Sequence, residues 1–159
     1  MPNGSVIQVS GLTKRYRAVT ALSDVTIEVK DGEIFGLIGP NGAGKTTAME
    51  CIEGLRLPDA GRISVLGLDP IRDVSALQRR IGIQLQEAQL QKRIKVREAL
   101  ALWSAVYQTP VDGRRLLQQL GIAGKENAWF MTLSGGQKQR LFIALALVHD
   151  PQLVFLVEL

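Results

Sequence analysis

Residues 39–47 read GPNGAGKTT and directly follow the apolar run EIFGLI at residues 33–38. A Gly, four further residues and Gly-Lys-Thr form a pattern that cradles phosphates where it joins a strand to a helix. A loop around a triphosphate must turn successive backbone amides inward. Gly39, Gly42 and Gly44 permit the positive-φ or close-approach conformations that this requires. The preceding run therefore predicts a buried strand that ends in a phosphate loop.

A helix is expected to begin at Lys45, and its N-terminus adds partial positive charge to the loop amides. We expect Lys45 to reach the β- and γ-phosphates, the Thr46 hydroxyl to ligate Mg²⁺ and Thr47 to donate near the α-phosphate. A plain glycine-rich turn does not explain the Lys-Thr pair between a strand and a helix. The predicted nucleotide-binding residues are Gly39, Pro40, Asn41, Gly42, Ala43, Gly44, Lys45, Thr46 and Thr47.

A second candidate phosphate site is the stretch LSGGQ at residues 133–137. Ser134 is a favourable N-cap and Gln137 follows three residues later, so the stretch also has the pattern of a capping box. Capping does not require the double glycine. Gly135 and Gly136 leave backbone amides accessible, as a phosphate site does. Kinases, GTPases and motor ATPases share the first motif, and this second motif distinguishes among them.

With both motifs present, the chain resembles the ATP-binding domain of ABC transporters, whose signature motif is LSGGQ. The resemblance covers residues 6–158, and stretches such as GEIFGLIGPNGAGKTT and SVLGLDP are closest to the drug and multidrug exporter branch. It implies an α/β P-loop NTPase fold with a parallel sheet core, an antiparallel β part and a helical signature subdomain. It also implies that Ser134, Gly135, Gly136 and Gln137 face the γ-phosphate held by a second domain.

Two further residues match the family in the correct order along the chain. Tyr16, in LTKRY, matches the aromatic residue that stacks on adenine, although, taken alone, an ordinary tyrosine at a strand end is the favoured explanation. Gln86, in IGIQLQE, matches the glutamine of the Q-loop, which contacts Mg²⁺ and reports to the membrane partner. A lone glutamine means little, and its place between the two phosphate motifs supports the assignment.

The run LVFLVEL at residues 153–159 departs from the family's second nucleotide motif, the Walker B strand that ends in Asp-Glu-Pro. Glu158 is kept and is the expected base for the attacking water. Val157 stands where the resemblance implies an aspartate that holds Mg²⁺ through water, and Leu159 replaces the proline. We expect residues 1–159 to be one ABC-type ATP-binding domain, C-terminally incomplete because it is truncated after this strand. His149 reads as an ordinary turn residue.

Alternating apolar and polar residues at 6–38 and 61–68 predict an antiparallel β part, whereas residues 71–80, 96–124 and 137–148 show helical periodicity. The stripe formed by Val96, Leu100, Trp103 and Tyr107 is expected in the core, and so is Cys51. The longest apolar run, residues 141–148, is well short of the roughly 20 residues of a membrane span.

The net charge is +4, and basic residues cluster at 79–80 and 92–97. Such clusters are more often solvated surface than binding sites. Aromatic residues make up 5% of the chain and are not interleaved with the basic ones, so nucleic acid is not expected as a partner. There are no sustained heptads between the two motifs, which disfavours the chromosome-structure and repair ATPases of the superfamily.

Taken together, the resemblance implies a cytoplasmic ATP-binding and ATP-hydrolysing subunit, peripheral at the inner face of the cell membrane, that powers export. Its cofactors would be ATP and Mg²⁺. Its partners would be a transmembrane permease subunit and a second ATP-binding domain in a homodimer. One alternative is a hydrolysis-defective nucleotide-binding fragment. Another is a soluble ABC-type ATPase acting in translation, for which the sequence shows no second cassette. A nucleotide kinase would not explain LSGGQ.

Overall fold

The computed structural model describes residues 4–84, 89–108 and 112–157. Two compact units make up the chain, residues 1–78 and 79–159. Gln86 and Glu158, the expected Q-loop glutamine and catalytic base, lie outside the described residues. The other expected site residues are described: Tyr16 and residues 39–47 belong to the first unit, and residues 134–137 belong to the second.

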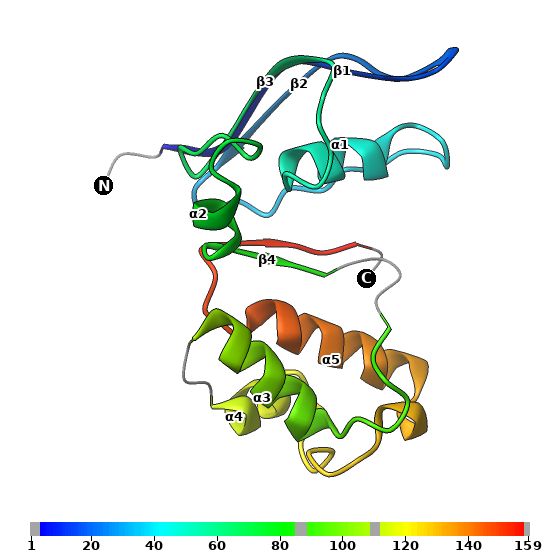
Figure 1. The fold of residues 1–159 in the computed structure, drawn as a ribbon, viewed down its shortest axis with the longest axis vertical. Coiled ribbons are helices and arrows are strands. Elements are labelled where there is room, and N and C mark those ends of the chain that lie inside the picture. Colours follow the sequence, from blue (N-terminus) through cyan, green and yellow to red (C-terminus); the bar gives the residue numbers. More distant parts are fainter. Residues whose placement is uncertain (1–3, 85–88, 109–111, 158–159) are drawn as a thin grey trace. The chain divides into compact units, whose positions relative to one another are not determined.

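The first unit is built on a three-stranded antiparallel sheet (Figure 1). Its strand order is β2-β1-β3. Strands β1 (Ser5–Tyr16) and β2 (Val19–Lys30) form a hairpin, and β3 (Ala60–Val65) pairs with the other edge of β1. Alternate residues of β1 turn to one face, so that Ile7 and Val9 are buried while Gln8 and Ser10 are exposed. The structure confirms the predicted antiparallel β part.

Helix α1 (Lys45–Ile52) contributes to the core of this unit through Ala48, Cys51 and Ile52, which are all buried. Cys51 is fully buried, as expected, and burial raises the pKa of its thiol. Helix α2 (Val74–Gln78) follows β3 and buries Leu77. The helix after the phosphate loop thus begins at the residue that the sequence predicted and buries the face that carries Cys51.

The apolar run before the phosphate loop, residues 33–38, does not form the predicted strand. Ile34 and Ile38 are 101% and 95% exposed, so their side chains pack against nothing among the described residues. A parallel strand is normally buried on both faces and hydrogen-bonded along both edges. None of the described strands pairs with this run, so its β propensity has no ladder to join. The prediction of a buried strand here is wrong for this structure.

The second unit combines a pair of parallel strands with a helical layer (Figure 1). Strand β4 (Ile81–Ile83) pairs in parallel with β5 (Leu153–Phe155). Gly82 lies so close to α5 (Gly135–Leu147) that an added Cβ would be 3.1 Å from the carbonyl carbon of Ala146. A glycine is therefore required where β4 packs against this helix.

The helical layer consists of α3 (Val96–Tyr107), α4 (Gly113–Gln119), a 3₁₀ turn (Phe130–Thr132) and α5. The sequence predicted helix throughout residues 96–124, but α3 ends where Gln108 adopts a left-handed conformation with φ 54°. Asp112 begins α4 by accepting a hydrogen bond from the amide of Arg115 at 3.1 Å. Local capping therefore divides a periodic segment into two helices.

Buried side chains of α3, α4 and α5 form a single apolar cluster. Val96 and Leu100 are buried in it, and Trp103 and Tyr107 pack against it, so the predicted core stripe is confirmed. The exposed polar residues of α5 lie near its start, and its second half is largely buried, as the sequence predicted. This cluster holds the beginning of α5, which carries the second phosphate motif, in a fixed place.

His149 is 8% exposed and is not the ordinary turn residue that the sequence suggested. Its ring stacks on that of Tyr107, with centroids 3.8 Å apart and planes 5° from parallel. Its Nε2 lies 3.0 Å from the carbonyl oxygen of Ile81, and burial lowers its pKa. His149 thus contacts both α3 and β4 within the second unit. These contacts are long-range, so the local sequence His-Asp-Pro does not predict them.

Candidate nucleotide-binding site

The phosphate loop owes its shape to two glycines. Gly42 and Gly44 have φ values of 84° and 82°, in the left-handed region that other residues rarely adopt. A Cβ on Gly44 would also lie 2.9 Å from Cδ2 of Leu22 and would collide with the carbonyl oxygen of Ala21. Gly39 has neither a positive φ nor a close approach of this kind. The loop is thus held against β2 at Gly44, the residue that precedes α1.

The N-terminus of α1 lacks a side-chain cap. Gly44 is the N-cap residue, and the amide of Ala48 makes the first helical hydrogen bond, to the Gly44 carbonyl at 2.8 Å. The earliest amides of a helix have no acceptor within it, so those of Lys45, Thr46 and Thr47 are free to bind an anion. The hydroxyl-bearing Thr46 is exposed beside them.

The Lys45 side chain lies across the loop that it follows. Its Nζ donates to the carbonyl oxygens of Gly39 and Pro40 at 2.7 and 2.8 Å. The loop itself is tightened by the amide of Ala43, which donates to Pro40 at 3.2 Å, while Asn41 is exposed. An anion that binds in the loop would exchange these neutral acceptors for charged ones, which form stronger hydrogen bonds with an ammonium group.

Tyr16, the candidate adenine-stacking residue, is 38% exposed at the end of β1. Two cations lie against its ring. The guanidinium carbon of Arg56 is 5.4 Å from the ring centroid, and Nζ of Lys14 is 5.8 Å from it. Both distances are within the range of cation–π attraction. The structure therefore places this aromatic ring in the same unit as the phosphate loop and surrounds it with positive charge.

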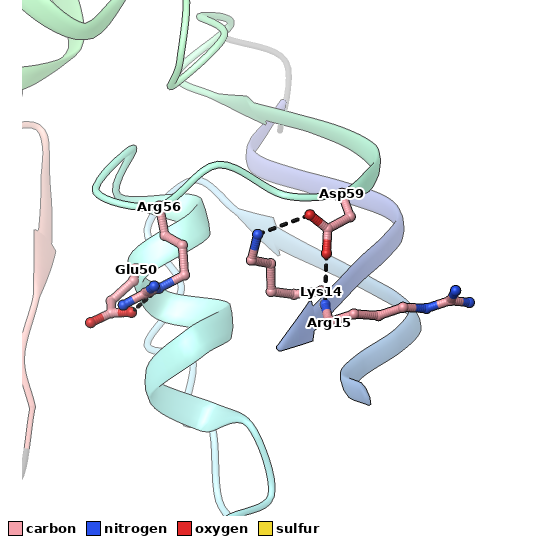
Figure 2. Close-up of polar contacts among 5 residues, drawn as sticks. All are labelled: Lys14, Arg15, Glu50, Arg56 and Asp59. Atoms are coloured by element: carbon pink, nitrogen blue, oxygen red, sulfur yellow. Dashed lines mark hydrogen bonds and ion pairs between the residues drawn. The ribbon is translucent and has the colours of Figure 1, made fainter. Parts of the chain in front are cut away.

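Both cations are fixed by carboxylates (Figure 2). Lys14 forms an ion pair with Asp59 at 2.9 Å, and Arg56 forms one with Glu50 of α1 at 2.5 Å. Asp59 also accepts from the amide of Arg15 at 2.7 Å, and the bonds from Lys14 and Arg15 lower its pKa. The sequence does not predict this cluster, because the charged residues at 14, 50, 56 and 59 match no motif.

A buried carboxyl group lies at the C-terminus of α1. Glu53, the C-cap residue, is 5% exposed, and its Oε1 has no hydrogen-bond partner among the described residues. Burial first, and the nearby charge of Glu50 second, raise the pKa of Glu53 from 4.5 to about 7. The ionised form is thus disfavoured in the folded protein.

We predict that Glu53→Gln stabilises the protein at pH 8 but not at pH 4.5. A pKa raised in the folded state makes the free energy of unfolding fall as pH rises from 4.5 to about 7, and the loss is complete above that range. A shift of this size corresponds to on the order of 3 kcal/mol. Urea unfolding at both pH values checks this, with the exposed Asp31→Asn as the control. Equal effects of Glu53→Gln at the two pH values would contradict the prediction.

The signature stretch forms the predicted capping box at the start of α5. Ser134 Oγ accepts from the amide of Gln137 at 3.3 Å, and Gln137 Oε1 accepts from the amide of Ser134 at 3.1 Å. Leu133 is buried and anchors the stretch, whereas Ser134, Gly135 and Gly136 are exposed. A Cβ on either glycine would meet nothing within 4 Å. The packing of this chain therefore does not require glycine at these positions.

The departure at position 157 lies just beyond the end of β5. Val157 is half-buried, and its carbonyl oxygen accepts from Nε2 of Gln84 at 3.4 Å. The amide of Gln84 donates to Phe155 at 3.0 Å, so this buried glutamine ties together the carboxyl ends of β4 and β5. Gln84 carries no motif signal of its own, whereas Gln86, the glutamine that matches the Q-loop, lies outside the described residues.

Within residues 4–84, 89–108 and 112–157, no group of three or more histidine, cysteine, aspartate or glutamate side chains forms a metal site. The part of the chain that the structure describes also contains no helix that is long and apolar enough to cross a membrane.

The sequence profile of one family, described as ABC transporter, matches residues 22–158. The chain belongs to the ABC transporter family. One relative is the methionine import ATP-binding protein MetN of Geobacillus kaustophilus, which is 36% identical over 166 residues and matches 96% of this chain and 48% of that protein. Another is the Nod factor export ATP-binding protein I of Rhizobium etli, 36% identical over 159 residues that cover 97% of this chain and 50% of that protein.

The chain thus spans about half the length of these curated relatives. A solved structure of an ATP-binding subunit of an ABC transporter is 28% identical and superposes with a TM-score of 0.82, covering 94% of this chain and 64% of that one. This likeness confirms the predicted α/β P-loop NTPase fold of the family.

Proposed function

We propose that this ABC transporter chain binds ATP with Mg²⁺ at residues 39–47 and hydrolyses it. The observation that carries the proposal is the uncapped start of α1 behind Gly42 and Gly44, with Lys45 already directed across the loop. Free amides, a helix N-terminus and an ammonium group are the chemistry that recognises a chain of phosphates. The exposed ring of Tyr16 would stack on the adenine base.

Mg²⁺ would enter as the complex with ATP, held by phosphate oxygens and by the Thr46 hydroxyl, as is usual for this ion. The family resemblance assigns Gln86 to the same ion and Glu158 to the attacking water. Catalysis in such sites is positioning combined with stabilisation of charge on the transferred phosphoryl group. Thr46 fits this role because its side chain is exposed at the beginning of α1.

A calorimetric titration of the protein with ATP in the presence of Mg²⁺ tests the proposed binding. We expect saturable binding of ATP and of inorganic tripolyphosphate, since the loop recognises phosphates. No binding of either ligand would refute the assignment of residues 39–47.

We also propose that the signature residues contact ATP held by a second ATP-binding domain, in a homodimer. The support is that Ser134, Gly135 and Gly136 are exposed, although no contact within the chain requires glycine there. Together with the N-terminus of α5, they offer a partner's nucleotide free amides and a hydroxyl group.

We predict that Ser134→Arg leaves ATP binding by the monomer nearly unchanged but prevents ATP-driven dimerisation. A long side chain would fill the space that the partner's nucleotide needs, while the phosphate loop of the same chain is untouched. Light scattering with and without ATP checks this. Arg140→Ala, a change on an exposed residue later in α5, serves as the control and should dimerise normally. Dimerisation of Ser134→Arg would show that the signature assignment is wrong.

The wider function that we propose is to power export through a transmembrane permease subunit, with this subunit peripheral at the cytoplasmic face of the membrane. The Nod factor export relative supports the exporter assignment, while the methionine import relative has the same 36% identity. Assignment to the drug and multidrug branch rests on the stretches GEIFGLIGPNGAGKTT and SVLGLDP. Transport by vesicles that contain the chain and its permease would test the direction.

A second candidate function is nucleotide binding without efficient hydrolysis. The observation that favours it is Val157, which supplies no carboxylate at the end of β5. The two candidates differ in turnover and agree on ATP binding.

A further inference from the structure

Arg56 connects the helix behind the phosphate loop to the ring of Tyr16. It lies in the segment between α1 and β3, and its Nε donates to Oε2 of Glu50 on α1 at 2.5 Å (Figure 2). On its other side, its guanidinium carbon is 5.4 Å from the centroid of the Tyr16 ring. The Arg56 side chain therefore contacts both α1, whose N-terminus is proposed to bind the phosphates, and Tyr16, which is proposed to stack on the base.

The backbone holds Arg56 in this place as well. The carbonyl oxygen of Glu50 accepts from the amides of Leu55 at 2.8 Å and Arg56 at 3.1 Å. The chain reaches this position through Gly54, whose φ of 77° and close approach to Pro70 favour glycine. Because main chain and side chain are both bound to Glu50, the guanidinium group moves with α1.

Two cations flank the Tyr16 ring. It lies at the turn end of the β1–β2 hairpin, where the last pair is Tyr16 with Val19, and it is 38% exposed. Lys14 provides the second cation, at 5.8 Å, and is itself held by Asp59. Attraction between these cations and the negative face of the ring thus restrains its position.

We infer that Arg56 is a positioning residue for the nucleotide base, because Glu50 holds its guanidinium group against the Tyr16 ring on which the base would stack. This inference rests on the proposed function. Its consequence is that α1 serves both ends of ATP, the phosphates through the amides at its N-terminus and the base through Glu50 and Arg56. The distance between the phosphate loop and the stacking ring is then set by one helix.

The competing explanation is that the Glu50–Arg56 pair only stabilises the fold or adds positive charge near the nucleotide. Glu50→Gln separates these possibilities because the two effects have opposite signs. Removing a negative charge would tighten binding of an anion if simple electrostatics dominated. If Arg56 is a positioning residue, a neutral amide holds the guanidinium group less firmly than the carboxylate does, and the binding of the base is weakened.

The experiment compares the Kd values of ATP and inorganic tripolyphosphate, by calorimetry, for the parent protein and for Glu50→Gln and Arg56→Gln. Tripolyphosphate has no base, so damage to the fold would weaken both ligands. We expect either variant to weaken ATP relative to tripolyphosphate by about two- to fivefold, the size of an exposed cation–π contact. The charge-matched controls are Asp69→Asn and Arg72→Gln, which alter an exposed ion pair in the same unit and should leave the ratio unchanged.

The same comparison in a Tyr16→Ala background completes the test. Because Arg56 is proposed to act through the ring, Arg56→Gln should then change the ratio no further. Suppose that the parent protein binds both ligands and that the ratio of the two Kd values is unchanged in Glu50→Gln and Arg56→Gln. This result would overturn the inference and leave the proposed function intact. An additional effect of Arg56→Gln without the ring would also overturn it. Absence of binding by the parent protein would instead refute the proposed function, and the inference with it.

Discussion

Lys45→Ala is expected to reduce ATP affinity by at least about a hundredfold, because it removes the only side-chain cation in residues 39–47. A hydrogen bond to a charged group contributes roughly 1.5–3 kcal/mol, and a factor of ten in Kd corresponds to about 1.4 kcal/mol. An ammonium group that reaches two phosphates makes at least two such bonds. The structure places Nζ within 2.8 Å of two loop carbonyls, so the group is already held beside the phosphate site.

Two further variants separate charge from loop structure. Lys45→Gln keeps a donor for the carbonyls of Gly39 and Pro40 but loses the charge, and it should bind ATP as poorly as Lys45→Ala. Lys30→Ala, at the exposed end of β2, gives the same change in net charge and should bind normally. Fluorescent-nucleotide titration measures all three. Parent-like affinity in Lys45→Ala would show that the phosphate loop is assigned incorrectly.

Local signals predicted most elements of the fold. Alternation along residues 6–38 and 61–68 predicts an antiparallel sheet, and its strands form within residues 5–30 and 60–65, since the period of a strand is visible within a few residues. The helix at 137–148 was equally clear. The strand predicted at residues 33–38 is absent because its formation depends on more than local sequence. Their composition is that of a buried parallel strand, but a strand also needs neighbours, and pairing is a long-range property that composition does not contain.

In the candidate site, too, local features are predictable from the sequence and long-range contacts are not. The phosphate loop and the capping box at Ser134 follow from residue types at fixed spacing, and the φ values of Gly42 and Gly44 agree with the reason for predicting glycine there. Glu50, Arg56 and Glu53 had no such signal. Their roles come from the return of the chain over α1 and from burial, which arise only after folding. Fixed spacing therefore predicts the local geometry of the loop and the capping box, but not contacts between distant segments.

Val157→Asp is expected to raise Mg²⁺-dependent ATP hydrolysis by about tenfold to a hundredfold, the usual effect of a group that orients a metal's ligands. Valine offers no oxygen to the water around Mg²⁺, so the ion that neutralises charge on the phosphoryl group would be held loosely. The position suits the change because it follows β5 directly and is only half-buried, so a carboxylate there keeps contact with solvent. Phosphate release at saturating ATP, measured across a Mg²⁺ titration, checks the rate.

Two controls show whether any gain comes from the proposed chemistry. Val157→Asn has nearly the same shape as the aspartate variant but no charge, so it should recover little, because a neutral amide attracts Mg²⁺ weakly. Adding Glu158→Gln to Val157→Asp should remove the activity again, since the base for the attacking water is lost. ATP affinity should stay within about twofold in all three proteins, because the binding free energy comes mainly from residues 39–47. Vigorous hydrolysis by the parent protein would contradict the role given to position 157, because that chain would then turn over without the carboxylate.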